Sequence, residues 1–498
     1  MTGGKRNRTW TRGALLAASA ALACAAHAGA ATIVVTGNGD ADASDGVVTL
    51  REAIVAANTN AANNDAPAGD TDLDTIDLTG ITGTITLGSA LPTISEDLAI
   101  VGPGSATLTV SGNNASRIIA TSAPLSISGL TLADGSASGS YPANCGGAIY
   151  ADTAGADVEL DGCVVTSCGA GARGGAVYME SATLTLDDCT VSSNTATLEG
   201  GGVYVNRYDL GSGGVGLHAT DSTISGNVSS DSGGGVYLYY AGVEMRRSTV
   251  SGNSAAGDGG GLCMMSDWNY DHLVESSTFS GNEAAGNGGG ARFGDNCTTV
   301  IRNSTFTLNV CDADSNGTGN GGGLAYYDPV TLASAVFSGN TDNGGQADDL
   351  FRGAGSVTAT CCLVEDAGGG HGITDGVDGN IVGQSAALGA LADNGGPTLS
   401  HLPGAASPAV DAGSNPAALS VDQRGWVRAS GGGVDIGGVE SESSGPPVPP
   451  SNSNDDCGTG TASPSCLLAL VGALLALSRR RGRGPTAVPA GGRCHGRA

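Results

Sequence analysis

The chain has few aromatic and few basic residues, and most of it lacks lysine. Phe, Trp and Tyr make up 4% of the 498 residues, and 21 Lys and Arg stand against 48 Asp and Glu. The basic residues also gather at both ends, so the stretch between Arg12 and Arg479 holds eleven Arg, no Lys and all 48 acidic residues, a formal charge of −37. Because phosphate binding requires clustered Lys and Arg, we expect no nucleic-acid partner.

Glycine, by contrast, is abundant. With 85 Gly and 17 Pro, these two residue types make up about a fifth of the chain, well above their usual share. Both are unfavourable in helix interiors, so the composition weakens any helical interpretation.

Residues 1–30 have the pattern of a secretory signal peptide. Basic residues precede an apolar run at 13–26 and small residues that end at Ala30. We therefore expect an exported protein, cleaved close to Ala30. Lipidation of Cys24 is the minor alternative.

The C-terminal end combines a linker with a hydrophobic segment. Residues 441–465 are rich in Pro and Ser, residues 466–483 are an apolar run that ends in several Arg, and residues 484–498 form a tail. This order resembles the C-terminal sorting signals of Gram-negative surface proteins, in which a membrane segment is recognised and often cleaved. The resemblance implies contact with a membrane before any processing, and either a place on the outer membrane or cell surface or release from it.

Two markers recur through the middle of the chain and indicate repeats. A Gly-Gly doublet followed by a small or aliphatic residue returns every 26 to 33 residues between Gly147 and Gly323. The second marker closes a strand, and its members are Cys168, Asn194, Asn227, Asn253, Asn282, Asn309 and Asn340. At ten, eight, five and three residues before it, the side chains are apolar or small, as in Val158, Leu160, Cys163 and Val165. Two period-2 pairs with one extra residue between them predict two strands joined by a corner.

Units of this size with three short strands predict an all-β fold, a parallel β-solenoid. Gly suits its corners because it adopts positive φ without steric cost, and Asn tolerates the same conformation. A leucine-rich repeat would need a helix in each unit, and a propeller would need four strands and about 40 residues. We expect the repeats at 136–385, an N-terminal cap with the first coils at 31–135 and a C-terminal domain at 386–440.

The repeat motifs also resemble a known family. Gly-Gly-Ala-Ile at 146–149, Gly-Gly-Ala-Val at 174–177 and Phe-x-x-Asn at 279–282 resemble the repeats of the polymorphic outer membrane protein family. This resemblance implies a right-handed parallel β-helix with coils of 26–33 residues on a bacterial surface.

Two further resemblances flank the repeats. Thr49–Ile54 resembles the Cys-Ser-Leu-Arg-Glu-Ala domain found ahead of such helices, with Val48 in place of the Cys. Four short segments resemble a domain that ends many exported solenoids and is followed by interchangeable C-terminal anchors. They are residues 394–398, 407–411, 422–425 and 435–437.

Parallel β-helices include pectate lyases and polygalacturonases, so an enzyme is the alternative. A lyase needs a free basic side chain beside Ca²⁺, but the Arg residues are scattered along the repeats. Hydrolysis needs two placed carboxylates, and Asp187 and Asp188 would point to opposite faces of a strand. The histidine of Gly370-His371-Gly372 matches a polygalacturonase motif only superficially and is more simply a loop residue. We therefore name no catalytic residue and consider an enzyme the less favoured interpretation.

The candidate ligand-binding residues are Arg207, Tyr208, Trp268 and Tyr270. They lie where coils are longer than their neighbours, and loops on a rigid scaffold often carry binding residues. An aromatic ring there can stack on a sugar or can simply cover the edge of the solenoid. Six other aromatic residues share one register and predict a structural ladder: Tyr150, Tyr178, Tyr204, Tyr237, Phe293 and Tyr326.

Asp312, Asp314 and Asn316 are the candidate metal ligands. They begin a D-x-D-x-N-G pattern, but Gly323 stands where an EF-hand has its last carboxylate. Ca²⁺ is thus expected only at a looser oxygen-ligand site, with a solvated acidic loop as the alternative.

Cys163 and Cys189 are the candidate disulfide. They occupy the same inward position in successive coils, about 4.8 Å apart, which is close to the usual Cα separation in a disulfide. Export permits the bond, and two reduced core residues are an equally good interpretation.

These patterns favour an exported, surface-anchored β-helix with an adhesin-like or surface-display role that binds a glycan or another cell surface. The alternative is a polysaccharide lyase or glycoside hydrolase acting on acidic polysaccharide. A passive envelope component is a third possibility.

Overall fold

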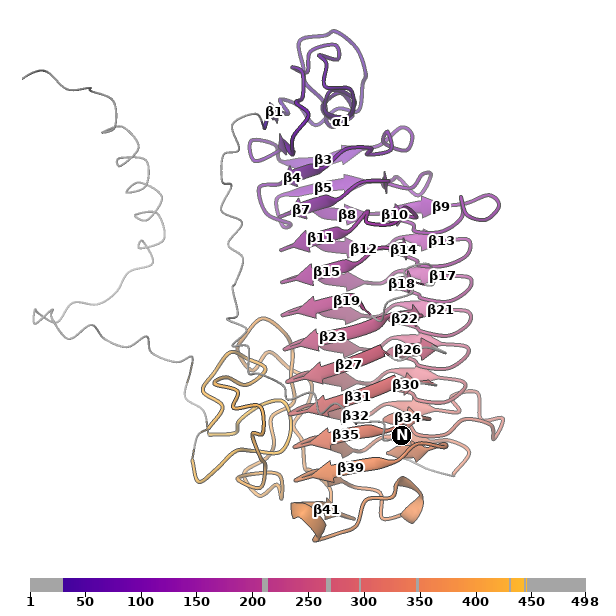
Figure 1. Ribbon diagram of the computed structural model, residues 1–498, viewed down its shortest axis with the longest axis vertical. Helices are drawn as coiled ribbons and strands as arrows, with labels where there is room; N and C mark the ends of the chain where they lie inside the picture. Colours follow the sequence, from indigo (N-terminus) through magenta and orange to yellow (C-terminus); the bar gives the residue numbers. More distant parts are fainter. Residues whose placement is uncertain are drawn as a thin grey trace, which may run out of the picture. The chain divides into compact units, whose positions relative to one another are not determined.

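The structure, a computed structural model, describes residues 30–207, 214–265, 270–294, 297–345, 349–429, 431–442 and 445. All of them belong to the compact unit Met1–Pro447, and the second unit, Val448–Ala498, lies outside the described residues. The described chain is a parallel β-helix of four sheets with an α-helix at its N-terminal end (Figure 1). The predicted all-β solenoid is confirmed. The expected signal peptide, linker and hydrophobic segment lie almost entirely outside the described residues.

The chain visits the four sheets in a fixed order, and we number them I to IV in that order. Sheet I holds β6 (Ile119–Thr121), β10 (Ile149–Ala151), β14 (Val177–Glu180), β18 (Val203–Asn206), β22 (Val236–Tyr239), β26 (Leu262–Met265), β30 (Ala291–Phe293), β34 (Leu324–Tyr326) and β38 (Leu350–Arg352). Sheet II holds β1 (Thr32–Val34), β2 (Asp74–Asp77), β4 (Leu98–Val101), β7 (Leu125–Ser128), β11 (Val158–Asp161), β15 (Leu184–Asp187), β19 (Val215–Thr220), β23 (Gly242–Arg246), β27 (Tyr270–Glu275), β31 (Cys297–Arg302), β35 (Val330–Ala333) and β39 (Val357–Thr360).

The other two sheets follow in the same coils. Sheet III holds β3 (Gly83–Thr86), β5 (Leu108–Ser111), β8 (Thr131–Ala133), β12 (Val164–Thr166), β16 (Thr190–Ser192), β20 (Thr223–Ser225), β24 (Thr249–Ser251), β28 (Thr278–Ser280), β32 (Thr305–Thr307), β36 (Val336–Ser338), β40 (Leu363–Val364) and β41 (Ile381–Val382). Sheet IV holds the two-residue strands β9 (Ser136–Ala137), β13 (Gly169–Ala170), β17 (Thr195–Ala196), β21 (Val228–Ser229), β25 (Ser254–Ala255), β29 (Glu283–Ala284), β33 (Val310–Cys311) and β37 (Thr341–Asp342).

A complete coil therefore has four strands, one more than the three that the sequence predicts. The strands of sheet IV contain only two residues each, which is too short to leave a hydrophobic period in the sequence. The inward positions agree with the prediction, because Val158, Leu160, Cys163 and Val165 are all buried in the continuous core.

The corner between sheets II and III is made by one residue with positive φ. It is the extra residue between the two period-2 pairs, and its φ lies between 46° and 58° in Gly162, Asp188, Asp221, Arg247, Ser276, Asn303 and other coils. A second corner residue with positive φ precedes each strand-closing Asn, for example Ser193 and Gly226. The predicted corner is confirmed, and it needs a left-handed residue in every coil.

The strand-closing Asn residues do not adopt positive φ, so the conformational role predicted for them is wrong. Their side chains point inward and form a ladder from Asn194 to Asn340, in which each Nδ2 donates to Oδ1 of the next Asn at 2.8–2.9 Å. Asp349 ends the ladder by accepting from Nδ2 of Asn340 at 2.8 Å. Burial raises the pKa of Asp349 to about 6.

The predicted aromatic ladder divides into two. Tyr150, Tyr178, Tyr204 and Tyr237 stack on the outer side of sheet I with ring centroids 5.1–5.5 Å apart. Phe293 and Tyr326 lie one residue further along their strands and belong to the inner core. A shift of one residue moves a side chain to the other face of a strand, so the single register was wrong for these two.

The N-terminal end is closed by α1 (Leu50–Thr59). Thr49 and Glu52 form a reciprocal capping box, which starts the helix. Ala53 and Ile54 are buried, and Arg51 bonds to Asp40 at 2.8 Å, so the helix covers the first coil and is tied to the loop before it.

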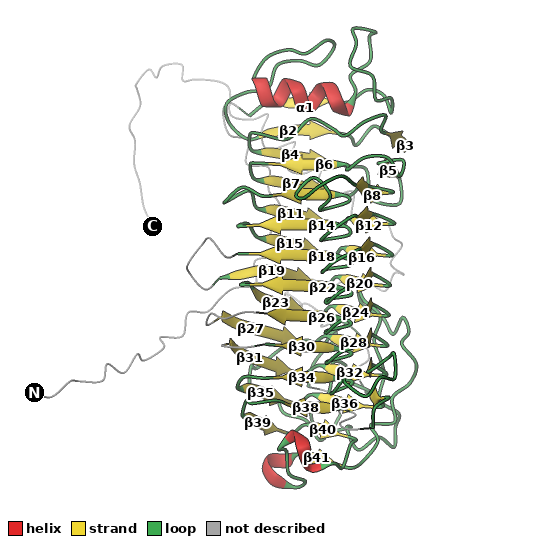
Figure 2. Ribbon diagram, turned by 90° about the vertical axis from the view of Figure 1, so that its right-hand side faces the viewer, coloured by secondary structure: helices red, strands yellow, loops and turns green. Residues whose placement is uncertain are grey.

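The segment 386–440 has no named strand and lies along the outer face of sheet III. Loops cover that face beside β24 to β36 and leave β12 to β20 uncovered (Figure 2). Two short 3-10 helices, η2 (Gly369–His371) and η3 (Val377–Gly379), precede it. Val336 and Leu363 pack against Ala386, Ala409 and Ile436, which makes a small apolar anchor between the segment and the coils.

Candidate functional site

Charged side chains gather on the outer face of sheet II. We call the residues concerned the charged strip: Glu159, Asp161, Asp187, Asp188, His218, Asp221, Glu244, Arg246, Arg247, Glu275 and Arg302. They face outward because side chains alternate along a strand and the aliphatic residues between them fill the core. Parallel register then places equivalent residues of successive coils side by side, so that Asp161 pairs with Asp187.

Asp187 and Asp188 both point to solvent, which contradicts the expectation that they face opposite sides of a strand. Asp187 is the last residue of β15, and Asp188 is the corner residue with φ 50°. The left-handed turn at Asp188 rotates its side chain outward, so neighbouring carboxylates are brought together instead of being separated.

One end of the charged strip is a group of three carboxylates, Asp161, Asp187 and Asp188. Among the described residues no ion pair joins Asp161, Asp187 or Asp188 to a cation. The pKa of Asp187 is raised, first by burial and then by the charges of Asp221 and Asp161. The pKa of Asp188 is raised by burial and by the same two charges. These carboxylates therefore hold protons more readily than an isolated Asp.

The other end of the charged strip is paired. Arg247 binds Asp221 with distances of 2.5 and 2.8 Å, and Arg246 bridges Glu244 and Glu275. Arg302 also bonds to Glu275. Because each guanidinium already has a carboxylate partner, none of these Arg residues is placed as the free base that a lyase requires.

His218 ends the paired part of the charged strip. Its Nδ1 lies 3.2 Å from a carboxylate oxygen of Glu244. This contact, followed by Arg246, holds the pKa of Glu244 down at about 2. Glu244 is thus ionised at neutral pH, while Asp187 and Asp188 are the carboxylates with raised pKa.

The described residues that border the two predicted ligand-binding loops lie at the opposite end of the same strands. Arg207 follows β18, and its Nη1 donates to Oγ1 of Thr183 at 2.6 Å and to the carbonyl of Val215 at 2.7 Å, which joins the loop to the start of β19. The backbone of Tyr270 begins β27, two coils further on. Tyr208 and Trp268 lie outside the described residues. Arg207 and the backbone of Tyr270 therefore lie at one end of the strands of sheet II, and most of the charged strip lies at the other end.

The comparisons with known proteins agree with this geometry. The family model for the right handed beta helix region matches residues 99–271, which include β11 to β23 and much of the charged strip. The chain forms a right-handed parallel β-helix. No curated protein matches the chain. Among the described residues, no helix has the length and apolar character needed to cross a membrane.

The predicted metal ligands form a tight loop on the β-helix. Asp312 is buried, and its carboxylate accepts hydrogen bonds from the backbone N–H groups of Asn316 and Gly317 at 2.8–3.0 Å. Asp314 is exposed and accepts from Nδ2 of Asn316 at 2.7 Å. The described residues contain no group of three or more His, Cys, Asp or Glu arranged to hold a metal ion. Calcium binding here stays a prediction.

Cys163 and Cys189 occupy the inward positions expected for them in successive coils of the β-helix. Both are thiols, and their Sγ atoms donate to the carbonyls of Ile127 at 3.4 Å and Leu160 at 3.2 Å, respectively. A disulfide between Cys163 and Cys189 stays a prediction.

His371 has a structural setting. It is 1% exposed at the end of η2, its Nδ1 accepts from the backbone of Ile373 at 3.1 Å, and burial lowers its pKa. Its carbonyl accepts the hydroxyl of Tyr326 at 2.9 Å. The simpler interpretation of the Gly-His-Gly motif, a loop histidine, fits this environment.

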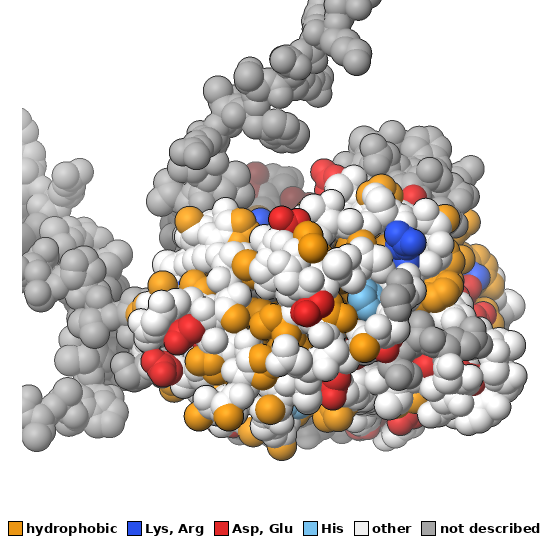
Figure 3. All heavy atoms as spheres, turned by 90° about the horizontal axis from the view of Figure 1, so that it is seen from below, with side chains coloured by type: hydrophobic (Ala, Val, Ile, Leu, Met, Phe, Trp, Pro, Cys, Tyr) orange, Lys and Arg blue, Asp and Glu red, His pale blue; other side chains and the backbone are white. Residues whose placement is uncertain are grey.

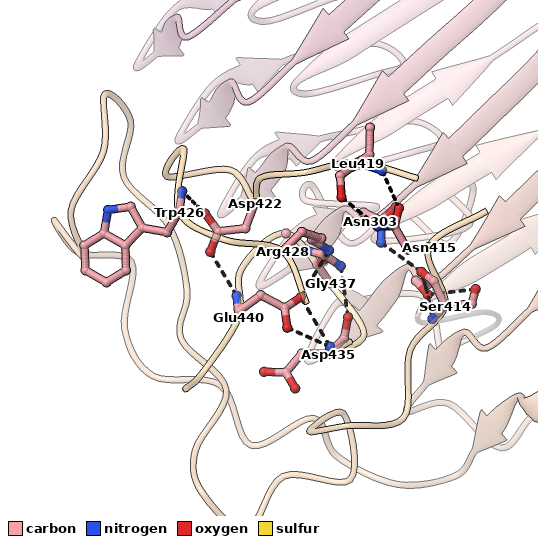
Figure 4. Close-up of polar contacts among 12 residues, drawn as sticks. Asn303, Ser414, Asn415, Leu419, Asp422, Trp426, Arg428, Asp435, Gly437 and Glu440 are labelled. Carbon is pink, nitrogen blue, oxygen red and sulfur yellow. Dashed lines mark hydrogen bonds and ion pairs between the residues drawn. The ribbon is translucent and has the colours of Figure 1, made fainter. Parts of the chain in front are cut away.

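A second cluster of charges is buried in the C-terminal segment (Figure 4). Arg428 is fully buried and donates to the carbonyls of Asp435 and Gly437 at 2.8–2.9 Å, and its Nε lies 3.1 Å from Glu440. Burial raises the pKa of Glu440 to about 8. With no exposed member among Arg428, Asp435 and Glu440, this cluster holds the segment together and is not a site for a large ligand.

The charged strip is the functional candidate that sequence reasoning missed. Its signal was present, because acidic residues recur six or seven places before the strand-closing residue in three successive coils, at Asp161, Asp187, Asp188 and Asp221. In a straight strand, adjacent Asp side chains would point to opposite faces. The left-handed corner decides otherwise.

Proposed function

We propose that the protein is an exported cell-surface β-helix with an adhesin-like role, which binds a glycan on the outer face of sheet II. The charged strip is the observation that supports this proposal. It presents polar side chains from six successive coils on a rigid surface, and Arg207, a predicted ligand-binding residue, contacts the start of one of the same strands. In this proposal the C-terminal hydrophobic segment holds the protein at the membrane before any processing.

The charge of the strip restricts the ligand. Seven carboxylates stand against the three guanidinium groups of Arg246, Arg247 and Arg302, and the surrounding chain is itself strongly acidic. The end of the unit seen in Figure 3 likewise shows acidic side chains at several places and few basic ones. Because like charges repel, a neutral or amino-sugar glycan fits this face better than a polyuronate.

One observation favours the alternative, a glycoside hydrolase. Asp161 and Asp187 lie on adjacent strands, so their Cα atoms are about 4.8 Å apart, and the pKa of Asp187 is raised. A retaining glycosidase needs two neighbouring carboxyl groups, one of them protonated. The hydrolase alternative therefore has a defined pair of residues, although its expected acidic substrate would meet the repulsion described above.

A glycan array probed with the full chain tests the proposal. We expect retained binding without release of reducing or unsaturated ends, and binding at least about tenfold weaker after the double substitution Asp187→Asn and Asp188→Asn. Glu283→Gln, an exposed carboxylate on sheet IV, is the matched control and should bind as the wild type.

Two results would decide against binding alone. Release of new sugar ends that is abolished by Asp187→Asn would establish the hydrolase. If the protein bound no glycan on the array, this result would contradict the proposed adhesin-like role.

A further inference from the structure

Charged side chains lie buried together in the C-terminal segment (Figure 4). We call them the buried charge cluster: Asp422, Arg424, Arg428, Asp435 and Glu440, all at most 5% exposed. Three carboxylates thus stand against two guanidinium groups. Because an Arg side chain stays protonated, the cluster has a net charge of −1 when every carboxylate is ionised and is neutral when one of them holds a proton. An uncompensated buried charge is costly, so the neutral form is favoured.

Two of the three carboxylates are well stabilised in their ionised form. Asp422 accepts hydrogen bonds from the side chain of Arg424 at 2.7 and 3.0 Å, and it accepts further bonds from backbone N–H groups. Asp435 accepts from the backbone N–H groups of Asp411 at 2.8 Å and Ser441 at 2.6 Å. Because such donors favour a charged carboxylate, Asp422 and Asp435 are the members that stay ionised.

Glu440 is the carboxyl group that holds the proton. It accepts from the backbone N–H of Asp435 at the longer distances of 3.2 and 3.3 Å. Nε of Arg428 lies 3.1 Å from it, but this N–H makes no hydrogen bond. Burial is the main cause that raises the pKa of Glu440 from an ordinary 4.5 to about 8. The charge of Arg428 opposes this rise, whereas those of Asp435 and Asp422 add to it.

One part of the buried charge cluster supports the main polar docking contact of the segment. The side chain of Gln423 bonds to the hydroxyl groups of Thr249 and Thr278 on sheet III. Asp422 and Arg424 precede and follow Gln423 in the sequence and are paired with each other. This ion pair therefore fixes the backbone from which Gln423 reaches the coils.

Another part of the cluster supports the apolar anchor. Ile436, a member of that anchor, directly follows Asp435. Gly437 comes next, and its N–H donates to the carbonyl of Ser334 at 2.9 Å, while its own carbonyl accepts from Nη2 of Arg428 at 2.8 Å. A change in the charge of the cluster thus acts directly on the groups that seat the segment on the coils.

The remaining surroundings of the docked segment are neutral near neutral pH. His401 is 1% exposed, and burial lowers its pKa below the ordinary 6.5, so the imidazole is uncharged above pH 6.5. Asp411 and Glu442 are exposed to solvent. The coil side chains that bond to the segment are hydroxyl and amide groups, those of Thr249, Thr278, Ser280, Asn303, Thr305, Ser334 and Ser338. Glu440 is therefore the buried group of the docked segment that changes its charge near neutral pH.

We propose that the buried charge cluster is a pH-sensitive latch, in which a proton on Glu440 holds the C-terminal segment on sheet III and loss of that proton weakens the docking. The docked segment binds this proton more tightly than the unfolded chain does. The stability that it contributes is therefore complete below a pH of about 4.5 and is lost as the pH rises through about 8. Release of the segment would uncover the outer face of β24 to β36. This device is independent of the glycan site proposed for sheet II.

Hydrogen exchange of the full chain at pH 6.5 and pH 8.5 tests the latch, with each rate corrected for intrinsic exchange at that pH. We expect the protection factors in residues 420–429 and 431–440 to fall about tenfold or more at the higher pH, while the strands of sheet II keep theirs. Glu440→Gln, whose side chain is neutral at both pH values, should keep the protection that the wild type has at pH 6.5.

Glu442→Gln removes an exposed carboxylate two residues away and is the matched control. This variant should lose protection at pH 8.5 as the wild type does. Three results would overturn the proposal: constant protection of the wild-type segment at the two pH values, the same fall in the Glu440→Gln variant, and an equal fall in the strands of sheet II. The first needs no variant, so the wild-type comparison decides even if Glu440→Gln does not dock its segment.

Discussion

Buried polar residues give the interior of this β-helix its register. Each amide of the Asn ladder donates to the next coil and to a backbone carbonyl, as Asn282 does to Asn309 at 2.8 Å and to Val250 at 3.0 Å. Ser222, Ser248 and Ser277 form a parallel column, in which each Oγ accepts a backbone N–H of the coil before it. A coil displaced by one residue would leave these groups buried without partners, which is costly.

Substitution of a central member of the Asn ladder should therefore destabilise the protein strongly. We expect Asn282→Ala to lower the free energy of unfolding by about 3 kcal/mol, because it removes an acceptor from Asn253 and a donor to Asn309. Asn343→Ala, at an exposed position, should change it by less than about 0.5 kcal/mol. Urea denaturation followed by circular dichroism measures both. Equal effects of the two substitutions would show that the ladder does not contribute.

His272 makes the stability depend on pH. It is 1% exposed inside the coil, and burial lowers its pKa to about 3 from an ordinary 6.5. Between these values the unfolded chain binds a proton that the folded chain does not, so stability is lost as the pH falls below 6.5.

Replacement of this histidine should remove its part of the pH dependence. We expect His272→Leu to gain about 2 kcal/mol of stability relative to the wild type when the pH is lowered from 7 to 5. Urea denaturation at both pH values gives the difference, and the change at pH 7 serves as the internal reference. A pH-independent difference would show that folding does not lower the pKa of His272.

At the scale of elements, the C-terminal segment is held by a few specific contacts. Gln423 is fully buried, and its side chain bonds to Thr249 at 3.1 Å and to Thr278 at 2.6 Å, across two coils. Asp422 and Arg424 on either side of it form a buried ion pair of 2.7 Å. The Asp-Gln-Arg-Gly motif thus docks the segment on sheet III.

Removal of the Gln423 side chain should loosen this docking without unfolding the coils. We expect Gln423→Ala to raise the rate of amide hydrogen exchange in residues 394–440 about tenfold, while the strands of sheet II keep their protection. Gln384→Ala, at an exposed position just before the segment, is the control. Increased exchange throughout the coils would mean that the segment is part of a single cooperative unit.

At the scale of the whole molecule, the large negative charge opposes the folded state. A formal charge of −37 lies between Arg12 and Arg479, and the seven carboxylates of the charged strip are concentrated on one face. Mutual repulsion in a compact protein is screened by salt, whose Debye length falls from about 30 Å at 0.01 M to about 10 Å at 0.1 M.

The thermal midpoint should therefore rise with salt. Between 0.01 M and 0.5 M NaCl we expect an increase of about 5 °C, measured by differential scanning calorimetry. Millimolar CaCl₂ at the same ionic strength separates screening from a specific site at Asp312 or elsewhere, since only a bound ion raises the midpoint further. A midpoint that stays constant or falls with NaCl would contradict the electrostatic account.

The sequence by itself determined the stacking direction and the inward residues of each coil. Every unit has the same local geometry: strands with period 2, one extra corner residue and a recurring small or amide residue. The periodicity of the sequence indicates such local geometry directly. The N-terminal cap could be anticipated in the same way, because Thr49 and Glu52 are three residues apart and cap the helix that they begin.

Tertiary structure alone decided what lies on the outside. The direction of Asp188 depends on a left-handed corner, the separation of Phe293 from the tyrosine ladder depends on register, and the burial of Thr249 depends on a segment 150 residues away in the sequence. The charged strip arises where many coils meet, so its residues are neighbours only after stacking. The glycine excess and the acidic charge could be read from the chain, but which faces they leave available follows from the packing of coil on coil.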